Sequence, residues 1–162
     1  FRAMKEDYPR AKNFASPGLA AGPCLFKDTM QMAAFHNNNF FLGHAAMLVN
    51  EGMPNFIVGK LKSMFGGSLR DKKVAILGMT FKADNDDIRE SLSFKIKKLL
   101  ELEMAAVMPS DPFLKDTYPM EQVLAEADAV ILGVPHSQYR TIVPSQPFID
   151  CWGVWEKKES QE

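Results

Sequence analysis

The pattern of hydrophobic and polar positions changes near residue 70. Before this point, apolar residues recur at three- and four-residue steps, which is the spacing of one face of an α-helix. After it, short unbroken apolar runs alternate with helical patterns, which is typical of buried parallel strands joined by helices. We therefore expect an α/β chain with a boundary near Arg70, dividing a helical part over residues 1–70 from a parallel-sheet domain over residues 71–162.

The first part predicts helical stretches separated by polar breaks. Residues 1–8 resemble the end of a helix that stops at the first proline. A second helix should begin at Pro23, whose ring suits a first helical turn, and end near Phe35. A third should begin near Phe40, and Pro54 should kink or restart it. It is apolar on two sides, which predicts burial at a subunit or domain interface. Its main stripe consists of Leu42, Ala46, Val49, Met53, Ile57, Leu61 and Met64.

The second part predicts a parallel sheet with ligands at one edge. The carboxyl ends of parallel strands meet at the same edge, where such folds bind ligands. The loop over residues 78–91 follows the first strand and is much longer than the usual connection of about two to six residues. It offers an aromatic ring and cations, but a solvated acidic surface loop would look the same. The expected strands cover residues 73–78, 105–108, 129–134 and 147–151, and the expected helices residues 90–103 and 120–127.

Composition and charge narrow the function classes. With 46% hydrophobic and 24% charged residues, the chain can form a substantial core. The net charge of −1 and the lack of a long basic run argue against a nucleic-acid surface. Neither a membrane-length apolar run nor a signal peptide is seen, which predicts a cytoplasmic protein without membrane contact. The two cysteines, Cys24 and Cys151, fit a reducing compartment better than a disulfide scaffold.

The start of the second expected helix holds the first candidate chemistry. Cys24 falls in the first turn, where free N–H groups and the helix dipole favour a thiolate. Asp28 follows one turn later on the same face, with Lys27 beside it. A lone cysteine is more commonly a buried structural residue, so these side chains do not by themselves identify a catalytic site.

Metal binding is not indicated by the sequence. The aspartates of the 78–91 loop lack the Gly and the terminal Glu of a calcium loop. His36 and His44 have no carboxylate at a ligand spacing. His136 follows the third strand and is a minor candidate for contact with a ligand at the sheet edge.

Two stretches of the chain resemble motifs of one enzyme family. Residues 22–28, Gly-Pro-Cys-Leu-Phe-Lys-Asp, resemble the catalytic-cysteine motif Gly-Gly-x-Cys-x-x-Lys-Asp of the UDP-glucose/GDP-mannose dehydrogenase family. Residues 74–91 are similar to its nucleotide-sugar-binding stretch, a strand followed by Gly-x-x-Phe-Lys-x-x-x-x-Asp-x-Arg-Glu-Ser. The pair Asn50-Glu51 on the intervening helix also matches, so the resemblance covers nearly the whole chain. The variant Ala-Gly-Pro-Cys-Leu-x-Lys-Asp-Thr resembles the branch that oxidises UDP-N-acetylmannosamine to its uronate, a reaction of polysaccharide biosynthesis.

The resemblance implies a helical dimerisation segment carrying the catalytic-cysteine loop, followed by a Rossmann-like UDP-binding domain. It implies that Cys24 attacks an aldehyde formed at C6 of the sugar. The thiohemiacetal then loses a hydride, and water hydrolyses the resulting thioester. Asp28, together with Lys27, is expected to position the water or assist proton transfer. The chain is expected to act as a homodimer on a UDP-sugar.

The same resemblance implies the binding residues. Arg89 is expected to reach toward NAD, which is bound mainly by an N-terminal domain that would precede Phe1. This chain alone is therefore expected to be an inactive fragment. Arg10 lies one residue out of register with an arginine that the family lends to the neighbouring subunit's site. The expected substrate contacts are Phe14, Gly18, Gly22, Phe81, Lys82 and Arg10.

Some positions depart from the family pattern, and two alternatives stay open. Ala21 replaces the first Gly of the cysteine motif, and Phe26 replaces its usual Pro. Cys151 interrupts the downstream Asp-Gly-Arg, which puts a late substrate-binding arginine in doubt. The alternatives are a stand-alone UDP-sugar binding or regulatory module without catalysis, and a fragment of a GDP-mannose dehydrogenase.

Overall fold

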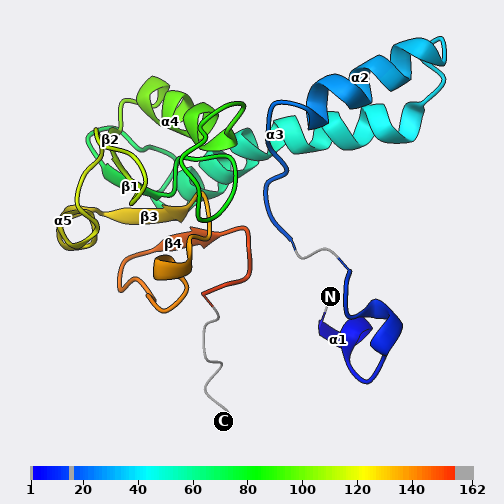
Figure 1. Cartoon of the computed structure of the whole chain (residues 1–162). Coiled ribbons are helices and arrows are strands. Elements are labelled where there is room, and N and C mark those ends of the chain that lie inside the picture. The colour runs from blue at the N-terminus through cyan, green and yellow to red at the C-terminus, as the bar shows by residue number, and fades with distance from the viewer. Residues whose placement is uncertain (1, 15–16, 156–162) are drawn as a thin grey trace.

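Parallel strands flanked by helices form the body of the chain, and a pair of helices projects from it (Figure 1). The structure, a computed structural model, describes residues 2–14 and 17–155. Its helices are α1 (Arg2–Lys5), α2 (Leu25–Phe35), α3 (Phe41–Met64), α4 (Leu92–Leu102) and α5 (Met120–Glu126), with short 3-10 turns η1 (Pro9–Ala11) and η2 (Ser137–Tyr139). Its strands are β1 (Lys73–Leu77), β2 (Ala106–Ser110), β3 (Ala129–Leu132) and β4 (Phe148–Asp150).

The sheet has the strand order β2-β1-β3-β4, and all neighbouring strands are parallel. In the register of the two central strands, Ile76 lies opposite Ile131. Helix α4 connects β1 to β2, and α5 connects β2 to β3. The predicted α/β class and parallel sheet are confirmed, since each expected strand and helix of this part lies within two or three residues of an observed one.

The two faces of the sheet pack against different helices. One core cluster joins Ile76 and Ile131 to Ile57 and Leu61 of α3 and to Ile96 of α4. The other cluster lies on the opposite face and contains Ala75, Leu77, Val130 and Leu132 with Val123 of α5, Tyr139 and Trp155. Because both faces are covered, the central strands are uniformly apolar rather than alternating.

Helix α3 belongs to the core only in its C-terminal half. Ile57 and Leu61 are fully buried there, but Leu42 is 83% exposed and Val49 is 68% exposed. Within a single chain the stripe is thus buried only in the second half of α3, and the first half packs against α2. Burial of this first half at a subunit or domain interface stays a prediction. Of the predicted kink or restart at Pro54, the restart is wrong, because α3 continues through this residue, which is itself buried.

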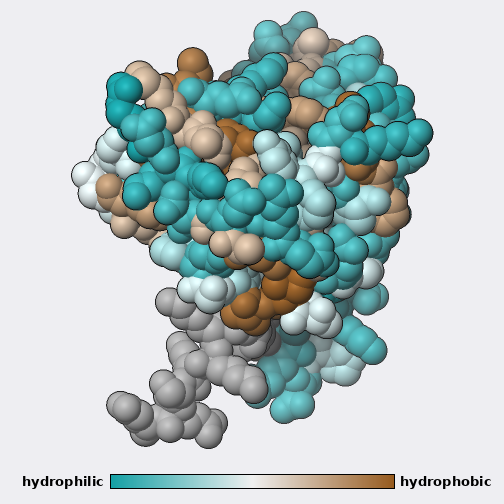
Figure 2. Space-filling view, turned by 90° about the vertical axis from the view of Figure 1, so that its left-hand side faces the viewer, coloured by the Kyte–Doolittle hydropathy of each residue, from teal (hydrophilic) through white to brown (hydrophobic). Residues whose placement is uncertain are grey.

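The outer face of the sheet domain is polar. Figure 2 views the side on which β2 and α5 lie and shows mostly hydrophilic residues with small apolar patches. No helix in the described part of the chain is both long and apolar enough to cross a membrane.

Candidate functional site

Cys24 lies at the start of α2 and is exposed to solvent. It is the N-cap residue, and its carbonyl accepts a hydrogen bond of 2.8 Å from the Asp28 N–H. The predicted helix start at Pro23 is thus two residues early, because the first helical residue is Leu25. Lys27 Nζ lies 3.4 Å from Asp28 Oδ1, and both side chains are exposed. The helix start therefore brings together the thiol, the carboxylate and the ammonium expected there.

The loop before Cys24 lies against two aromatic side chains of the sheet domain. At Gly22 the backbone has φ +120°, and a Cβ atom would approach Phe81 Cδ2 at 3.2 Å. At Gly18 a Cβ atom would overlap the ring of Trp152. Both glycines therefore allow the loop to pass directly over aromatic rings. Their backbone φ angles are ones that residues other than glycine rarely adopt.

Asn50 holds the same loop from the other side. Its Oδ1 accepts a hydrogen bond of 2.9 Å from the Ala20 N–H, and its Nδ2 donates one of 2.6 Å to the Ala20 carbonyl. The neighbouring Glu51 forms an ion pair with Lys95 of α4. The Asn50-Glu51 pair thus connects the cysteine loop, α3 and the sheet domain, a role that the sequence alone did not assign.

The loop over residues 78–91 is closed by its own hydrogen bonds. The Phe81 N–H donates to the Asp87 carbonyl at 2.9 Å, and the Ser91 hydroxyl donates to the Thr80 carbonyl at 2.9 Å. The Thr80 hydroxyl donates to the Lys82 carbonyl at 3.0 Å. This connection is an ordered turn in which Phe81 is half-buried and Lys82 is exposed, and it is not merely a solvated acidic loop.

Arg89 forms a forked ion pair with Asp87 in the same loop. Its Nη2 lies 2.7 Å from Asp87 Oδ2, and its Nε lies 3.0 Å from Oδ1. Hydrogen bonding to Arg89 lowers the pKa of Asp87 to about 2. The pKa of Arg89 is raised, first by hydrogen bonding to Asp87 and then by the charge of Asp87. The pair therefore stays ionised at neutral pH.

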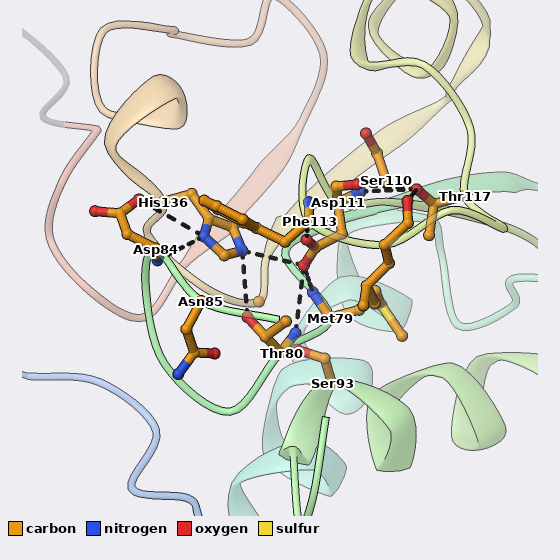
Figure 3. Close-up of polar contacts among 12 residues, drawn as sticks. Met79, Thr80, Asp84, Asn85, Ser93, Ser110, Asp111, Phe113, Thr117 and His136 are labelled. Carbon is orange, nitrogen blue, oxygen red and sulfur yellow. Dashed lines mark hydrogen bonds and ion pairs between the residues drawn. The ribbon is translucent and has the colours of Figure 1, made fainter. Parts of the chain in front are cut away.

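A buried polar network lies beneath this loop, at the carboxyl ends of β1, β2 and β3 (Figure 3). Asp111 Oδ2 accepts a hydrogen bond of 2.6 Å from the Met79 N–H and lies 3.0 Å from His136 Nε2. Its Oδ1 accepts one of 2.9 Å from the Phe113 N–H. Burial by itself raises the pKa of Asp111, but the hydrogen bonds from His136, Met79 and Phe113 outweigh it and lower that pKa.

The network corrects one expectation and adds a residue that sequence reasoning missed. His136 is 0% exposed, so the structure places it under the loop and away from any ligand on the surface. In the sequence, Asp111 stands out only as a residue that follows a predicted strand. The further signal that could have found it is that a polar side chain follows each of three neighbouring strands, at Thr80, Asp111 and His136.

The stability of this chain is expected to fall in acid. The pKa of Asp87 is about 2 in the folded chain, below the usual value of about 3.9. The pKa values of Asp84 and Asp111 are lowered as well. A lowered carboxyl pKa contributes stability that is present above the unfolded-state pKa and is lost as the pH falls through the folded value. Urea unfolding should therefore show a falling midpoint between about pH 5 and pH 2, and an unchanged or rising midpoint would contradict this.

Two predicted substrate residues do not join the site within this chain. Arg10 and Phe14 are exposed, and the segment with α1 and η1 lies apart from the sheet in Figure 1. Arg10 is expected to serve a neighbouring subunit, so its role stays a prediction.

The described turn after β1 is not a typical dinucleotide-binding turn. It lacks Gly-x-Gly-x-x-Gly, and the buried side chains of Asp111 and His136 lie at this edge of the sheet. In residues 2–14 and 17–155, no three His, Cys, Asp or Glu side chains are placed to hold a metal ion.

Comparisons with known proteins identify the architecture. Residues 75–157 match the model of the UDP binding domain of the UDP-glucose/GDP-mannose dehydrogenase family. The chain is 28% identical over 144 residues to UDP-N-acetyl-D-mannosamine dehydrogenase from Pyrococcus horikoshii, covering 86% of this chain and 34% of that protein. It is 30% identical over 174 residues to the enzyme of the same name from Yersinia pestis, covering 91% of this chain and 40% of that protein.

A solved structure agrees with these relatives. The UDP-glucose dehydrogenase from Pyrobaculum islandicum matches with a TM-score of 0.79 at 27% identity, covering 94% of this chain and 39% of that chain. The chain thus spans about two fifths of that structure, and 34% and 40% of the two relatives. The predicted family resemblance is confirmed: the chain belongs to the UDP-glucose/GDP-mannose dehydrogenase family.

Proposed function

We propose that this chain binds a UDP-sugar beside the start of α2 and supplies the nucleophile of an NAD-dependent nucleotide-sugar 6-dehydrogenase. One observation carries the proposal: Gly22, two residues before Cys24, lies against Phe81. Phe81 belongs to the loop that also carries Lys82 and Arg89. The reactive thiol and the candidate nucleotide-binding side chains therefore border the same space.

The proposed binding roles follow from exposure and charge. Lys82 is exposed and cationic, which suits a diphosphate. Phe81 presents a half-buried ring beside Gly22, which suits contact with the nucleotide-sugar. A small hollow next to the helix start has room for about one water molecule and not for a nucleotide-sugar. Its lining residues are Ala20, Ala21, Gly22, Leu25, Phe26, Met47, Asn50, Glu51 and Glu90.

In the proposed reaction, Cys24 Sγ adds to the carbonyl carbon of a C6 aldehyde, and the carbonyl oxygen takes a proton. Loss of a hydride from C6 and of the hydroxyl proton then converts the thiohemiacetal into the thioester. NAD would supply the hydride acceptor in this chemistry, and Arg89 is the residue of this chain that we propose to reach toward it. Water then attacks the thioester carbon, which releases the carboxylate and the free thiol. Asp28 is exposed one turn from Cys24, with Lys27 beside it, and is placed to orient this water or accept its proton.

The proposal extends to the substrate and the assembly. We assign UDP-N-acetylmannosamine, because the cysteine motif and the two relatives named above agree on it. The division into residues 1–70 and 71–162 and a homodimer through the helical segment are part of the same proposal. The dimer is supported by the exposed apolar side chains of Leu42 and Val49 on α3.

Calorimetry with UDP and GDP tests this function. UDP should bind to the 162-residue chain more tightly than GDP, and Lys82→Ala should weaken UDP binding about 10-fold through loss of a charge-assisted contact. Lys98→Ala is the matched control, because Lys98 is an exposed lysine on α4 outside the site. Tighter binding of GDP would favour the GDP-mannose branch, and binding of neither nucleotide would contradict the proposal.

Gly22→Ala is expected to weaken UDP binding as well as stability. The left-handed backbone should cost about 1–2 kcal/mol in the free energy of unfolding, and the new methyl group would press on Phe81. Gly67→Ala is the control, since Gly67 has φ +94° but no atom lies within 4 Å of the place that its new methyl group would take. It should lower stability similarly and leave UDP binding unchanged. Equal UDP affinities in both variants would argue against a role for the Gly22–Phe81 contact.

A further inference from the structure

We propose that His136 is a positioning residue, which holds the loop carrying Phe81 and Lys82 without touching the ligand. The inference rests on the proposed function for its effect on nucleotide binding. Its structural part, the anchoring of the loop, stands on the hydrogen bonds alone.

The hydrogen bonds of the ring specify its protonation. His136 Nδ1 lies 2.9 Å from the Asp84 backbone nitrogen, which can only donate. Nδ1 must therefore be an acceptor without a proton. The proton is then on Nε2, which lies 3.0 Å from Asp111 Oδ2 and donates to it. Each ring nitrogen thus has a distinct task, and the neutral Nε2–H form performs both.

Burial makes both hydrogen bonds necessary. His136 is 0% exposed, and its ring packs 5.0 Å from that of Phe113 and 5.5 Å from that of Tyr139, centroid to centroid. In such an environment a ring nitrogen without its partner is costly, because water cannot replace the lost hydrogen bond. The aromatic neighbours also restrict rotation of the ring. Its orientation, and with it the position of Asp84, is therefore well defined.

The part of the loop between Met79 and Asp84 contains the two candidate ligand contacts and is anchored at both ends. Asp111 holds its beginning through the Met79 N–H, and His136 holds its end through the Asp84 N–H (Figure 3). Phe81 and Lys82 lie between these anchors.

Asp84 needs this support because its backbone conformation is unfavourable. It lies in the left-handed region, at φ +57°, which few residues other than glycine adopt. Its carboxylate accepts hydrogen bonds from Ser137, at 2.8 Å from the N–H and 2.6 Å from the hydroxyl. The Ser137 contacts hold the side chain of Asp84, whereas His136 holds its backbone N–H. Losing that acceptor should loosen the loop locally without unfolding the sheet.

Two substitutions separate the tasks of the ring. His136→Asn can place an amide oxygen near the position of Nδ1, which keeps an acceptor for the Asp84 N–H. His136→Gln can place an amide nitrogen near the position of Nε2, which keeps a donor to Asp111. Each variant loses one of these two hydrogen bonds, so each serves as the control for the other. Nε2 also lies 3.3 Å from Thr80 Oγ1, a contact that His136→Asn loses together with the bond to Asp111.

The test measures amide hydrogen exchange in the free 162-residue chain and UDP affinity by calorimetry. In His136→Gln, the Asp84 amide should exchange at least about 10-fold faster and UDP should bind about 10-fold more weakly. In His136→Asn, both quantities should stay within about 3-fold of the parent chain. The two variants could instead lose amide protection and UDP affinity equally, and only as much as their lower stability explains. That result would show a merely structural role of His136 and overturn the proposal.

The unsubstituted chain provides a second measurement. Nitrogen chemical shifts should show the Nε2–H tautomer of His136, and the Asp84 amide should exchange slowly. An Nδ1–H tautomer or a rapidly exchanging Asp84 amide would overturn the inference even if neither variant folds. If the chain binds no UDP, the proposed function fails, but the exchange contrast still decides whether His136 anchors the loop.

Discussion

Iodoacetamide is expected to alkylate Cys24 on the order of 100-fold faster than Cys151 at about pH 7.5. Burial, and then the charge of Asp150, raises the pKa of Cys151 to about 11. A rise from 9.0 to about 11 lowers the thiolate fraction at this pH by about 100-fold. Cys24 is exposed at the start of a helix, where reagents can reach it. Mass spectrometry of timed samples measures both rates in the same chain.

Single-cysteine variants are the controls for this measurement. Cys151→Ser should leave the rate at Cys24 unchanged, and Cys24→Ser should leave only slow labelling of Cys151. Equal and slow rates at the two thiols would contradict a nucleophilic Cys24. They would favour the alternative in which the chain is a UDP-sugar binding module without catalysis.

Asp111→Asn is expected to lower the free energy of unfolding by about 2–4 kcal/mol. Asp111 is 4% exposed and accepts hydrogen bonds from the N–H groups of Met79 and Phe113 and from His136. An amide at this position must turn one NH₂ group toward these donors, and a buried donor facing another donor loses its partner. Urea unfolding at neutral pH measures the loss.

Asp116→Asn is the matched control, because Asp116 is exposed in the same connection between β2 and α5. It should change the free energy of unfolding by less than about 0.5 kcal/mol. A loss this small for Asp111→Asn would mean that the buried network does not support the ends of the strands.

The sheet domain was predictable because its signals are local. The apolar runs of β1 and β3 are fully buried along the sheet except for Lys73, and Leu92, Ile96 and Leu100 at helical spacing on α4 are buried as well. Such patterns depend on the period of side chains along one element, which the sequence displays directly.

The helical part was less predictable because its packing depends on what covers it. The stripe of α3 has one regular spacing, but only the half beside the sheet, with Ile57 and Leu61, is buried. Spacing alone does not distinguish this half from the one that carries Leu42 and Val49. The predicted start of α2 is also two residues early, because Pro23 suits a first turn but here precedes the N-cap.

The buried network was not predicted because it joins three separate strand ends, and only the strand order shows that these ends are neighbours. Thr80, Asp111 and His136 are far apart in the sequence, and each is unremarkable among its neighbours there. The strand order β2-β1-β3 brings them together. By contrast, the family motifs lie on two loops that the sequence itself displays. The structure adds the contact between these loops, from Gly22 to Phe81, and the hydrogen bonds from Asn50 of α3 to Ala20.

The central claim is that Cys24 faces a sugar site completed by the loop with Phe81 and Lys82. Its most direct test is the alkylation rate of Cys24 with and without UDP-N-acetylmannosamine at a concentration that calorimetry shows to be saturating. Bound UDP-sugar should slow labelling of Cys24 several-fold, UDP alone should protect it less, and labelling of Cys151 should be unaffected. Labelling of Cys24 at the same rate in the free and the saturated chain would contradict the central claim.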